Sequence, residues 1–351
     1  MLRNIKIEGF RGIRSIELDE LQIINVLIGE NNSGKTSVLE AIQLLAQPEV
    51  LAGLYRVAYR REYGNNHMLS KAALSMTDLV LYTLNQREDK ELCVEAIDSE
   101  LGQVRAYIQG KEYCYMSNYQ TTDLFQEDGI YYGFRGTYEY DSEVISYRDS
   151  FDLKDQARMI RSKNQDVIPM GYLNPQMIHT QNASIKSMYN AMRSEERREL
   201  IELLGIFDSR IIGIDRTVRS GRAITFLELE NGDLMPVSTF GDGIKKVLAI
   251  ANVIMKTKGG VVLIDEFETG IHKKALSKVA AWLYQAAKEY NTQIFLTTHS
   301  SEALEALLDE SFEQGSVNTY RIEQYKGDTF VKKFNGESLE KYRNNGGMDI
   351  F

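Results

Sequence analysis

The sequence VLIGENNSGKTSVLEAI, residues 26–42, joins an apolar run to a helical pattern through a loop of glycine, asparagine and serine. Residues 29–36 fit the pattern G-x-x-x-x-G-K-[ST] at every fixed position. Glycine lets such a loop turn with its N–H groups inward, and the following helix start favours anions, so the loop can cradle phosphate. In this pattern Lys35 reaches the β- and γ-phosphates, and the hydroxyl of Thr36 can ligate Mg²⁺. The stretch therefore predicts a loop that wraps a triphosphate, with ATP and Mg²⁺ as the expected cofactors.

A chance turn is the alternative interpretation of this loop, and the apolar strand before it and the helix after it argue against that alternative. Lys35 is also predicted to be catalytic, because its charge meets the phosphates that react. The residues predicted to bind the nucleotide are Gly29, Asn31, Asn32, Ser33, Gly34, Lys35, Thr36 and Ser37.

A pair of carboxylates follows a second apolar run, VVLI at residues 261–264. Asp265 and Glu266 would stand at the carboxyl end of a strand, which is the edge where open α/β sheets bind ligands. Asp265 is predicted to hold the magnesium through water, and Glu266 to orient and deprotonate the attacking water. An acidic pair after a strand is also a common feature of surface loops, and the upstream phosphate loop favours the functional interpretation.

The order of predicted elements divides the chain into a core and an insertion. Residues 1–28 alternate like strands, and from residue 240 helices and strands alternate as in α/β proteins. Short strands are predicted at 91–98, 103–108 and 129–134, with a hairpin turn at Asn231-Gly232. We predict a split nucleotide-binding core of residues 1–48 and 225–351. The insertion, 49–224, would have a β-rich part at about 90–170 and a helical part at about 175–207.

Composition limits the environment and the partners of the chain. The formal charge of -9 gives no general attraction to nucleic acid, so contact with DNA would need a local basic patch. Two cysteines, Cys93 and Cys114, are too few for a disulfide framework or a thiolate zinc site. No apolar run approaches the length of a membrane span. We therefore expect a cytoplasmic protein without a membrane partner.

The acid pair and distant phosphate loop resemble those of ABC-type ATPases of the SMC and RecF class. Three further stretches carry this resemblance: MLRNIKIEGFRGIRSIEL at the N-terminus, FGDGIK at residues 240–245 and FLTTHS at residues 295–300. Within the class, GENNSGKTSVLEAI, the GDG loop and DEFETGIH resemble the ATPases of the overcoming-lysogenisation-defect (OLD) group. Its stand-alone relatives include ATPase subunits of anti-phage systems such as PARIS. The resemblance implies an α/β P-loop NTPase fold with an ABC/SMC-like head, a mixed sheet, an antiparallel β subdomain and a central α+β insertion.

The same resemblance implies that two heads sandwich two nucleotides. The signature loop of one head, here Gly241, Asp242 and Gly243, would cap the γ-phosphate held by the other head. A glycine turn at a helix start suits that role, because it offers free N–H groups to phosphate. The usual serine of this loop falls on Gly241, which departs from the family pattern.

Other roles also follow from the resemblance alone. His299 would sense the γ-phosphate as a catalytic residue, and Arg11 would contact the nucleotide. Residues 268–272 resemble the loop that touches the opposite head, and Gln176 is the candidate for the glutamine loop.

The expected function is that of a magnesium-dependent ATPase whose paired heads regulate a separate effector protein, a nuclease, in bacterial anti-phage defence. Full-length OLD proteins resemble this ATPase joined to a TOPRIM nuclease, and the residues after His299 are too few for one. Two alternatives remain open: a RecF-like DNA-repair ATPase, and a scaffold in which ATP joins subunits without being hydrolysed. Three arginine- and lysine-containing clusters could contact DNA or merely face solvent, at residues 158–163, 193–198 and 216–222.

Overall fold

Three β-sheets organise the chain, in a computed structural model that describes residues 1–63, 83–84, 91–114, 130–141, 143–149, 166–179, 185–219, 222–308 and 315–334. The central sheet has the strand order β15-β14-β3-β13-β12-β8. Its strands are β3 (Ile24–Ile28), β8 (Met170–Leu173), β12 (Val261–Ile264), β13 (Gln293–Thr297), β14 (Val317–Tyr325) and β15 (Asp328–Phe334). All neighbours from β14 to β8 pair in parallel, and β15 is antiparallel to β14. The carboxyl ends of the parallel strands therefore meet at one edge.

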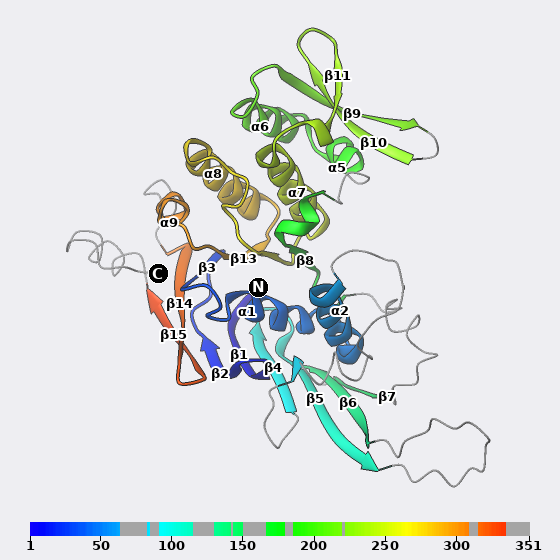
Figure 1. The fold of residues 1–351 in the computed structure, drawn as a ribbon, viewed down its shortest axis with the longest axis vertical. Coiled ribbons are helices and arrows are strands. Elements are labelled where there is room, and N and C mark those ends of the chain that lie inside the picture. Colours follow the sequence, from blue (N-terminus) through cyan, green and yellow to red (C-terminus); the bar gives the residue numbers. More distant parts are fainter. Residues whose placement is uncertain are drawn as a thin grey trace, which may run out of the picture.

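Both faces of the central sheet are buried, which explains the unbroken apolar runs of β3 and β12. Successive side chains point to opposite faces of a strand. Leu263 accordingly packs in the cluster that contains α1, and Ile264 in the cluster that contains α7, α8 and α9. Figure 1 shows α1 on one side of β3 and β13 and the other three helices on the opposite side. These helices are α1 (Lys35–Ile42), α7 (Asp242–Lys256), α8 (Lys273–Glu289) and α9 (Ser301–Leu307).

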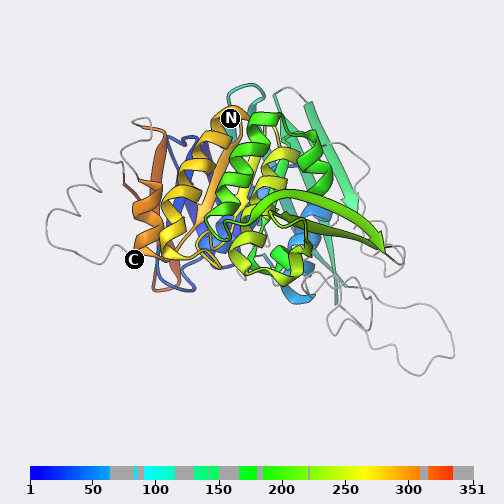
Figure 2. The same cartoon turned by 90° about the horizontal axis from the view of Figure 1, so that it is seen from above.

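An antiparallel sheet covers α1 from the other side, with the order β2-β1-β4-β5-β6-β7. Its strands are β1 (Leu2–Phe10), β2 (Ile13–Leu18), β4 (Glu91–Asp98), β5 (Gly102–Cys114), β6 (Ile130–Tyr140) and β7 (Glu143–Asp149). Helix α2 (Val50–Tyr63) follows α1 and the short helix η1 (Gln43–Leu45). Tyr138 ties this sheet to the α1 region, because its hydroxyl donates to the carbonyl of Leu45 at 2.6 Å. Figure 2 shows β14 and β15 at one side of the molecule and the β5 and β6 strands at the other.

A small third sheet, β11-β10-β9, lies beyond α7 (Figure 1). The turn between β10 and β11 contains Asn231 and Gly232, as predicted, and Gly232 has a positive φ of 81°. The remaining elements are η3 (Pro175–His179), α5 (Ile185–Ala191), α6 (Ser194–Gly205), β9 (Ile211–Arg219), β10 (Arg222–Leu229), β11 (Leu234–Pro236) and η4 (Val237–Thr239).

The predicted fold class, an α/β P-loop NTPase with a mixed sheet and an antiparallel subdomain, is confirmed. Strands of the range 49–224 pair with both larger sheets: β4 with β1, and β8 with β12. The division into a core of 1–48 and 225–351 and an insertion of 49–224 stays a prediction. None of the helices in the described ranges has the length and apolar composition that crossing a bilayer requires.

The fit of β8 beneath α7 can be tested at Gly171. A Cβ atom there would lie 2.5 Å from Cγ1 of Val253 and 2.6 Å from Oγ1 of Thr257, which no side chain tolerates without movement. Gly171→Ala should lower the free energy of unfolding by about 1–3 kcal/mol, the usual cost of overpacking, as measured by denaturant unfolding. Gly205→Ala is the matched control, because a Cβ at Gly205 meets nothing within 4 Å. Equal stability of both variants would contradict this packing.

Candidate functional site

The predicted phosphate-binding loop directly follows β3, so it lies at the carboxyl edge of the central sheet. Gly29 has a φ of 139°, and a Cβ there would lie 2.2 Å from the carbonyl oxygen of Ile322 on β14. Gly34, directly before α1, has a φ of 106°. Asn32 also adopts a positive φ, of 66°, which asparagine tolerates better than most residues. The glycines predicted from the sequence pattern are therefore required by backbone conformation at both ends of the loop.

Lys35 turns its ammonium group back into the loop. Nζ donates to the carbonyl oxygens of Gly29 at 2.6 Å and Glu30 at 2.7 Å. Burial lowers the pKa of Lys35 from its ordinary value, and the carboxylates of Asp265, Glu268 and Glu266 oppose that shift. The lysine charge thus lies between the loop and the acid pair, where the phosphates of a nucleotide would be neutralised.

The remaining predicted loop residues differ in exposure. Asn31 and Asn32 are exposed and Ser37 is half-buried. The hydroxyl of Ser33 is buried, and among the residues that the structure describes it has no hydrogen-bond partner. Contact of Asn31, Asn32, Ser33 and Ser37 with a nucleotide stays a prediction.

Thr36 and Asp265 meet although 229 residues separate them in the sequence. The Thr36 hydroxyl lies 3.1 Å and 3.0 Å from the two carboxylate oxygens of Asp265. Hydroxyl and carboxylate oxygens are ligands that Mg²⁺ prefers, and such ions usually keep several waters beside one or two protein ligands. No cluster of three or more potential metal-binding His, Cys, Asp or Glu side chains occurs in the described part of the chain. The chemistry of the Thr36–Asp265 pair suits a magnesium ion shared with phosphates, and binding of the metal there stays a prediction.

Glu266 presents an exposed carboxylate beside the buried Asp265. Its backbone is left-handed, with a φ of 49°, and its N–H donates to the hydroxyl of Thr297 at 2.8 Å. One carboxylate oxygen, Oε2, accepts a hydrogen bond from the hydroxyl of Thr269 at 2.9 Å. Because a left-handed conformation is costly for a residue with a side chain, these contacts fix an unusual direction for the carboxylate.

His299 follows β13 at the same edge and is half exposed, at 51% of its side-chain surface. Its backbone N–H and its ring Nδ1 both lie against Oε1 of Glu268, at 2.9 Å and 3.0 Å. The structure thus brings His299 next to Glu268. Its contact with the γ-phosphate stays a prediction.

The predicted signature loop forms the start of α7. Gly241 is the residue before the helix, and Gly241 and Asp242 are exposed. Gly243 is buried, because a Cβ there would lie 2.5 Å from the Phe207 ring and 2.9 Å from the carbonyl oxygen of Gly270. The signature loop therefore packs on the loop after the acid pair of its own chain, and capping of a partner's nucleotide stays a prediction.

Arg11 is held by a carboxylate on α1. Its guanidinium is paired with Glu40, which also pairs with Arg61 at 3.2 Å. Burial lowers the pKa of Arg11 and raises that of Glu40, so desolvation outweighs the attraction between them. Contact of Arg11 with nucleotide stays a prediction.

Gln176 is exposed and lies in the short helix η3, which follows β8. Strand β8 is the parallel neighbour of β12. Gln176 therefore stands at the same sheet edge as Asp265. Its assignment to a glutamine loop stays a prediction.

Two residues that contact the acid pair, Thr297 and Lys246, were not predicted from the sequence. Thr297, the last residue of β13, donates to Asp265 at 2.7 Å, and its hydroxyl accepts from the N–H of Glu266. Lys246 on α7 is fully buried, and its Nζ lies 3.3 Å and 2.9 Å from the carbonyl oxygens of Asp265 and Glu266. The threonine could have been found as a polar residue ending an apolar strand. The lysine had no such signal, because solvent-facing lysines on helices are ordinary.

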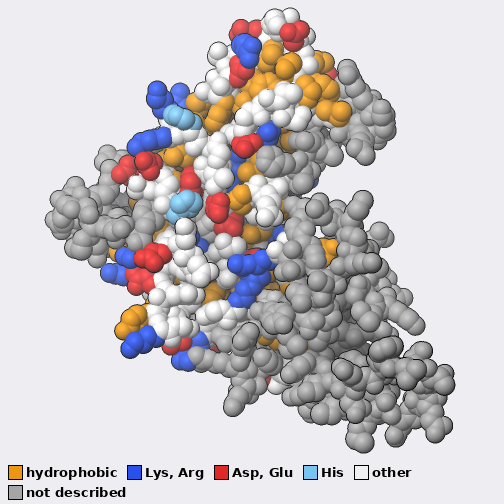
Figure 3. All heavy atoms as spheres, viewed as in Figure 1, with side chains coloured by type: hydrophobic (Ala, Val, Ile, Leu, Met, Phe, Trp, Pro, Cys, Tyr) orange, Lys and Arg blue, Asp and Glu red, His pale blue; other side chains and the backbone are white. Residues whose placement is uncertain are grey.

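Of the three basic clusters, only residues 193–198 have their side chains in the described part of the molecule, and these arginines all have partners on their own chain. Arg193 pairs with Glu196 and Glu289, Arg197 donates to backbone carbonyls, and Arg198 lies near Glu202. Residues 158–163 lie outside the described residues, as do the side chains of the arginines at 216, 219 and 222. Figure 3 shows acidic and basic side chains interspersed over the described part of one face.

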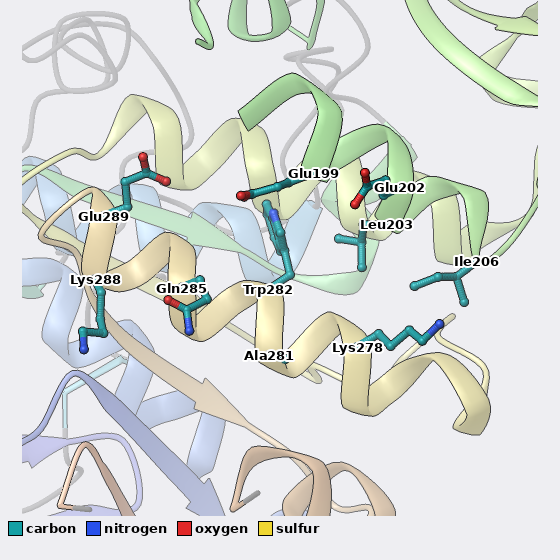
Figure 4. Close-up of a pocket in the computed structure, with 10 residues that line it drawn as sticks. All are labelled: Glu199, Glu202, Leu203, Ile206, Lys278, Ala281, Trp282, Gln285, Lys288 and Glu289. Carbon is teal, nitrogen blue, oxygen red and sulfur yellow. The ribbon is translucent and has the colours of Figure 1, made fainter. Parts of the chain in front are cut away.

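A groove of about 780 Å³ lies between α6 and α8, away from the phosphate loop. Figure 4 shows Trp282 rising from α8 toward α6, with Glu199 beside it and Leu203 across the gap. None of the residues that line this groove belongs to the phosphate loop, the acid pair or the signature loop. It is therefore separate from the nucleotide site.

The fold and this site together define a P-loop ATPase of the ABC/SMC-like class. Two crystal structures of SMC heads share the fold. The head bound to the C-winged helix domain of ScpA has a TM-score of 0.53 at 13% identity, with 97% of this chain and 99% of that chain aligned. A head with an extended coiled coil, from a complex derived from Pyrococcus furiosus, has a TM-score of 0.51 at 10% identity, over 98% of each chain.

The chain belongs to the family described as "AAA domain, putative AbiEii toxin, Type IV TA system", whose model matches residues 123–305, just over half of the sequence. A second model, described as an AAA ATPase domain, matches residues 1–93. The first match contains the acid pair and the second contains the phosphate loop.

Curated relatives carry related names. A Helicobacter pylori protein named "ATP/GTP phosphatase" is 22% identical in an alignment that covers 98% of each chain. The "Retron Vc95 probable ATPase" of Vibrio cholerae is 20% identical over 92% of this chain and 74% of that protein. A RecF protein of Exiguobacterium sp. is 43% identical over 61 residues, only 17% of this chain and 15% of its own length. The family matches and these names support ATP hydrolysis in general.

The Thr36–Asp265 contact predicts a metal-dependent effect on nucleotide affinity. Thr36→Val removes the hydroxyl and keeps the side-chain shape, so affinity for the nucleotide with Mg²⁺ should fall by about tenfold, equivalent to roughly 1.4 kcal/mol. Affinity without Mg²⁺ should change far less, as calorimetry with and without the metal would measure. Thr137→Val on β6 is the control, because Thr137 lies in the antiparallel sheet. Equal losses with and without Mg²⁺ would contradict the assignment of Thr36 as a metal ligand.

Proposed function

We propose that this ATPase binds ATP with Mg²⁺ between two paired heads, hydrolyses it, and acts as the sensor or regulatory subunit of an anti-phage system of OLD or PARIS type. In that role it controls a separate effector nuclease. The observation that carries the ATPase part is the contact of Thr36 with Asp265, beside the exposed carboxylate of Glu266.

The residues divide the chemistry between them. Lys35 neutralises phosphate charge, and Thr36 with Asp265 would hold the metal. Bound Mg²⁺ polarises the phosphoryl group and offsets the charge that develops on it. Glu266 orients the attacking water and accepts its proton on a carboxylate oxygen. Asp265 is buried and accepts hydrogen bonds from Thr36 and Thr297, whereas the carboxylate of Glu266 is exposed to water.

Pairing of heads is supported by the exposed start of α7. Gly241 and Asp242 face solvent, and the first N–H groups of a 15-residue helix lack partners within the helix. Helix starts of this kind bind phosphate. A partner head would place this helix start on the γ-phosphate, so that ATP joins the heads and hydrolysis releases them.

Regulation of another protein is supported by the names of relatives. One relative is a retron ATPase, and the family description names a toxin–antitoxin system. An SMC head of the same fold was crystallised with a domain of ScpA, so this head architecture can bind a partner protein. The effector, a nuclease on another polypeptide, is our inference from the OLD resemblance.

A RecF-like repair ATPase is the second candidate, and local identity favours it. The match to RecF reaches 43% but spans 61 residues only. That function would need tight DNA binding by the ATP-bound form, which the formal charge of -9 does not assist.

Glu266→Gln should trap a closed assembly, because the amide keeps its shape and cannot accept a proton from water. Light scattering should show a mass near twice that of the monomer with ATP and the monomer mass without it, and hydrolysis should fall by at least roughly a hundredfold. Lys35→Ala is the control and should neither bind ATP nor pair. Wild-type hydrolysis by Glu266→Gln would refute its role as base, and unchanged mass with ATP would refute paired heads. Pairing of the wild type without any hydrolysis would identify the non-hydrolysing scaffold instead.

The regulatory role can be separated from repair in cells and on DNA. Cells carrying this gene with its neighbouring reading frame should resist phage, and Lys35→Ala should abolish that resistance. The ATP-bound Glu266→Gln protein should bind duplex DNA weakly, as measured by anisotropy over a salt series. Tight binding with a steep salt dependence, together with no phage resistance, would favour the RecF-like function.

A further inference from the structure

Glu268 contacts both the backbone and the ring of His299. Oε1 of Glu268 accepts the backbone N–H of His299 at 2.9 Å, and the ring Nδ1 lies 3.0 Å from the same oxygen. We propose that Glu268 is a positioning residue that fixes the ring and tautomer of His299 for the nucleotide. This inference rests on the proposed function of the site, and it assigns Glu268 to its own chain's chemistry.

Hydrogen-bond chemistry determines the tautomer. An ionised carboxylate only accepts, so the Nδ1 of His299 must carry the proton in this contact. Nε2 is then the ring nitrogen left for a ligand, on a side chain that is 51% exposed. In the neutral ring Nε2 only accepts, as from a water molecule, and in the imidazolium it donates to a phosphate oxygen. The backbone N–H of His299 bonds the same oxygen, so the Glu268 carboxylate is held directly beside the ring. The arrangement is that of a carboxylate orienting a functional imidazole.

Burial makes Glu268 a rigid support. Its side chain is 11% exposed, compared with 51% for His299. Its second oxygen, Oε2, is buried and has no hydrogen-bond partner among the residues that the structure describes. Burying an unpaired carboxylate oxygen is costly unless positive charge lies nearby.

Lys246 and Lys35 supply that charge. Lys246 is fully buried, with its ammonium on the carbonyls of Asp265 and Glu266. Burial lowers the pKa of Lys246 to about 8, and Glu268 is the carboxylate that opposes this shift most. Glu268 also opposes the lowering of the Lys35 pKa. The carboxylate that contacts His299 therefore interacts electrostatically with both lysines.

A double-mutant cycle tests whether Glu268 acts through His299. Glu268→Ala should lower kcat for ATP hydrolysis by roughly 10- to 100-fold with little change in KM, as loss of a partner that orients an imidazole does. His299→Ala should cost about as much, and the double variant should lose no more than either single variant. Glu268→Gln keeps an acceptor oxygen and should recover part of the rate. Losses that multiply in the double variant would overturn the proposal.

A spectroscopic measurement tests the tautomer without relying on activity. The chain has four histidines, so ¹⁵N-histidine labelling with His299→Ala as the assignment reference resolves the ring. At a pH where the ring is neutral, Nδ1 of His299 should be protonated and Nε2 not, and Glu268→Ala should remove that preference. Protonated Nε2 in the wild type would overturn the proposal.

Glu305→Gln is the control for both measurements, because Glu305 is an exposed carboxylate on α9. It should leave both kcat and the tautomer unchanged. If the protein hydrolyses no ATP, the proposed function fails, and the spectrum still decides the role of Glu268.

Discussion

The hydrogen bond between the Thr36 hydroxyl and the Asp265 carboxylate joins the N-terminal phosphate loop to the distant acid pair. The candidate nucleotide site depends on this contact. The contact exists because β13 lies between β3 and β12 in a fixed register. Leu27 pairs with Thr297, and Ile264 with Leu296. A shift of one residue in either pair would move every side chain of the strand to the opposite buried face and exchange its packing partners. Packing of the two cores therefore determines the distance between the phosphate loop and the acid pair.

Conformational strain accompanies this register. Gly29 lies so close to the carbonyl of Ile322 that no side chain fits, and Glu266 is held at a φ of 49°. A left-handed conformation costs roughly 1–3 kcal/mol for such a residue. Hydrogen bonds of about 1 kcal/mol each, from the Glu266 N–H to Thr297 and from Lys246 to the Glu266 carbonyl, offset that cost. Thr297 on β13 and Lys246 on α7 thus offset the conformational free-energy cost of the Glu266 backbone.

Sequence patterns predicted the features that are determined by residues close together in the sequence. The loop between β3 and α1, the place of the acid pair after β12 and the turn at Gly232 each depend on neighbouring residues, so their patterns predicted these positions in the fold. Strand β8 was not predicted, because it has four residues, contains Gly171 and ends near a proline. The roles of Lys246 and Glu268 could not be predicted either. Their partners are 19 to 31 residues away, and only packing of α7 and β13 brings them together.

Packing around Gly243 connects the exposed start of α7 to the acid pair. Gly243 lies against the carbonyl of Gly270, and a Cβ at Gly270 would be 3.1 Å from Cβ of Asp242. Cores at this density do not deform continuously, so a displaced helix start must carry the loop after Glu266 with it. The same helix carries Lys246, which bonds the carbonyls of both acidic residues. The start of α7 and the acid pair are therefore joined by two sets of contacts, one at Gly243 and Gly270 and one at Lys246.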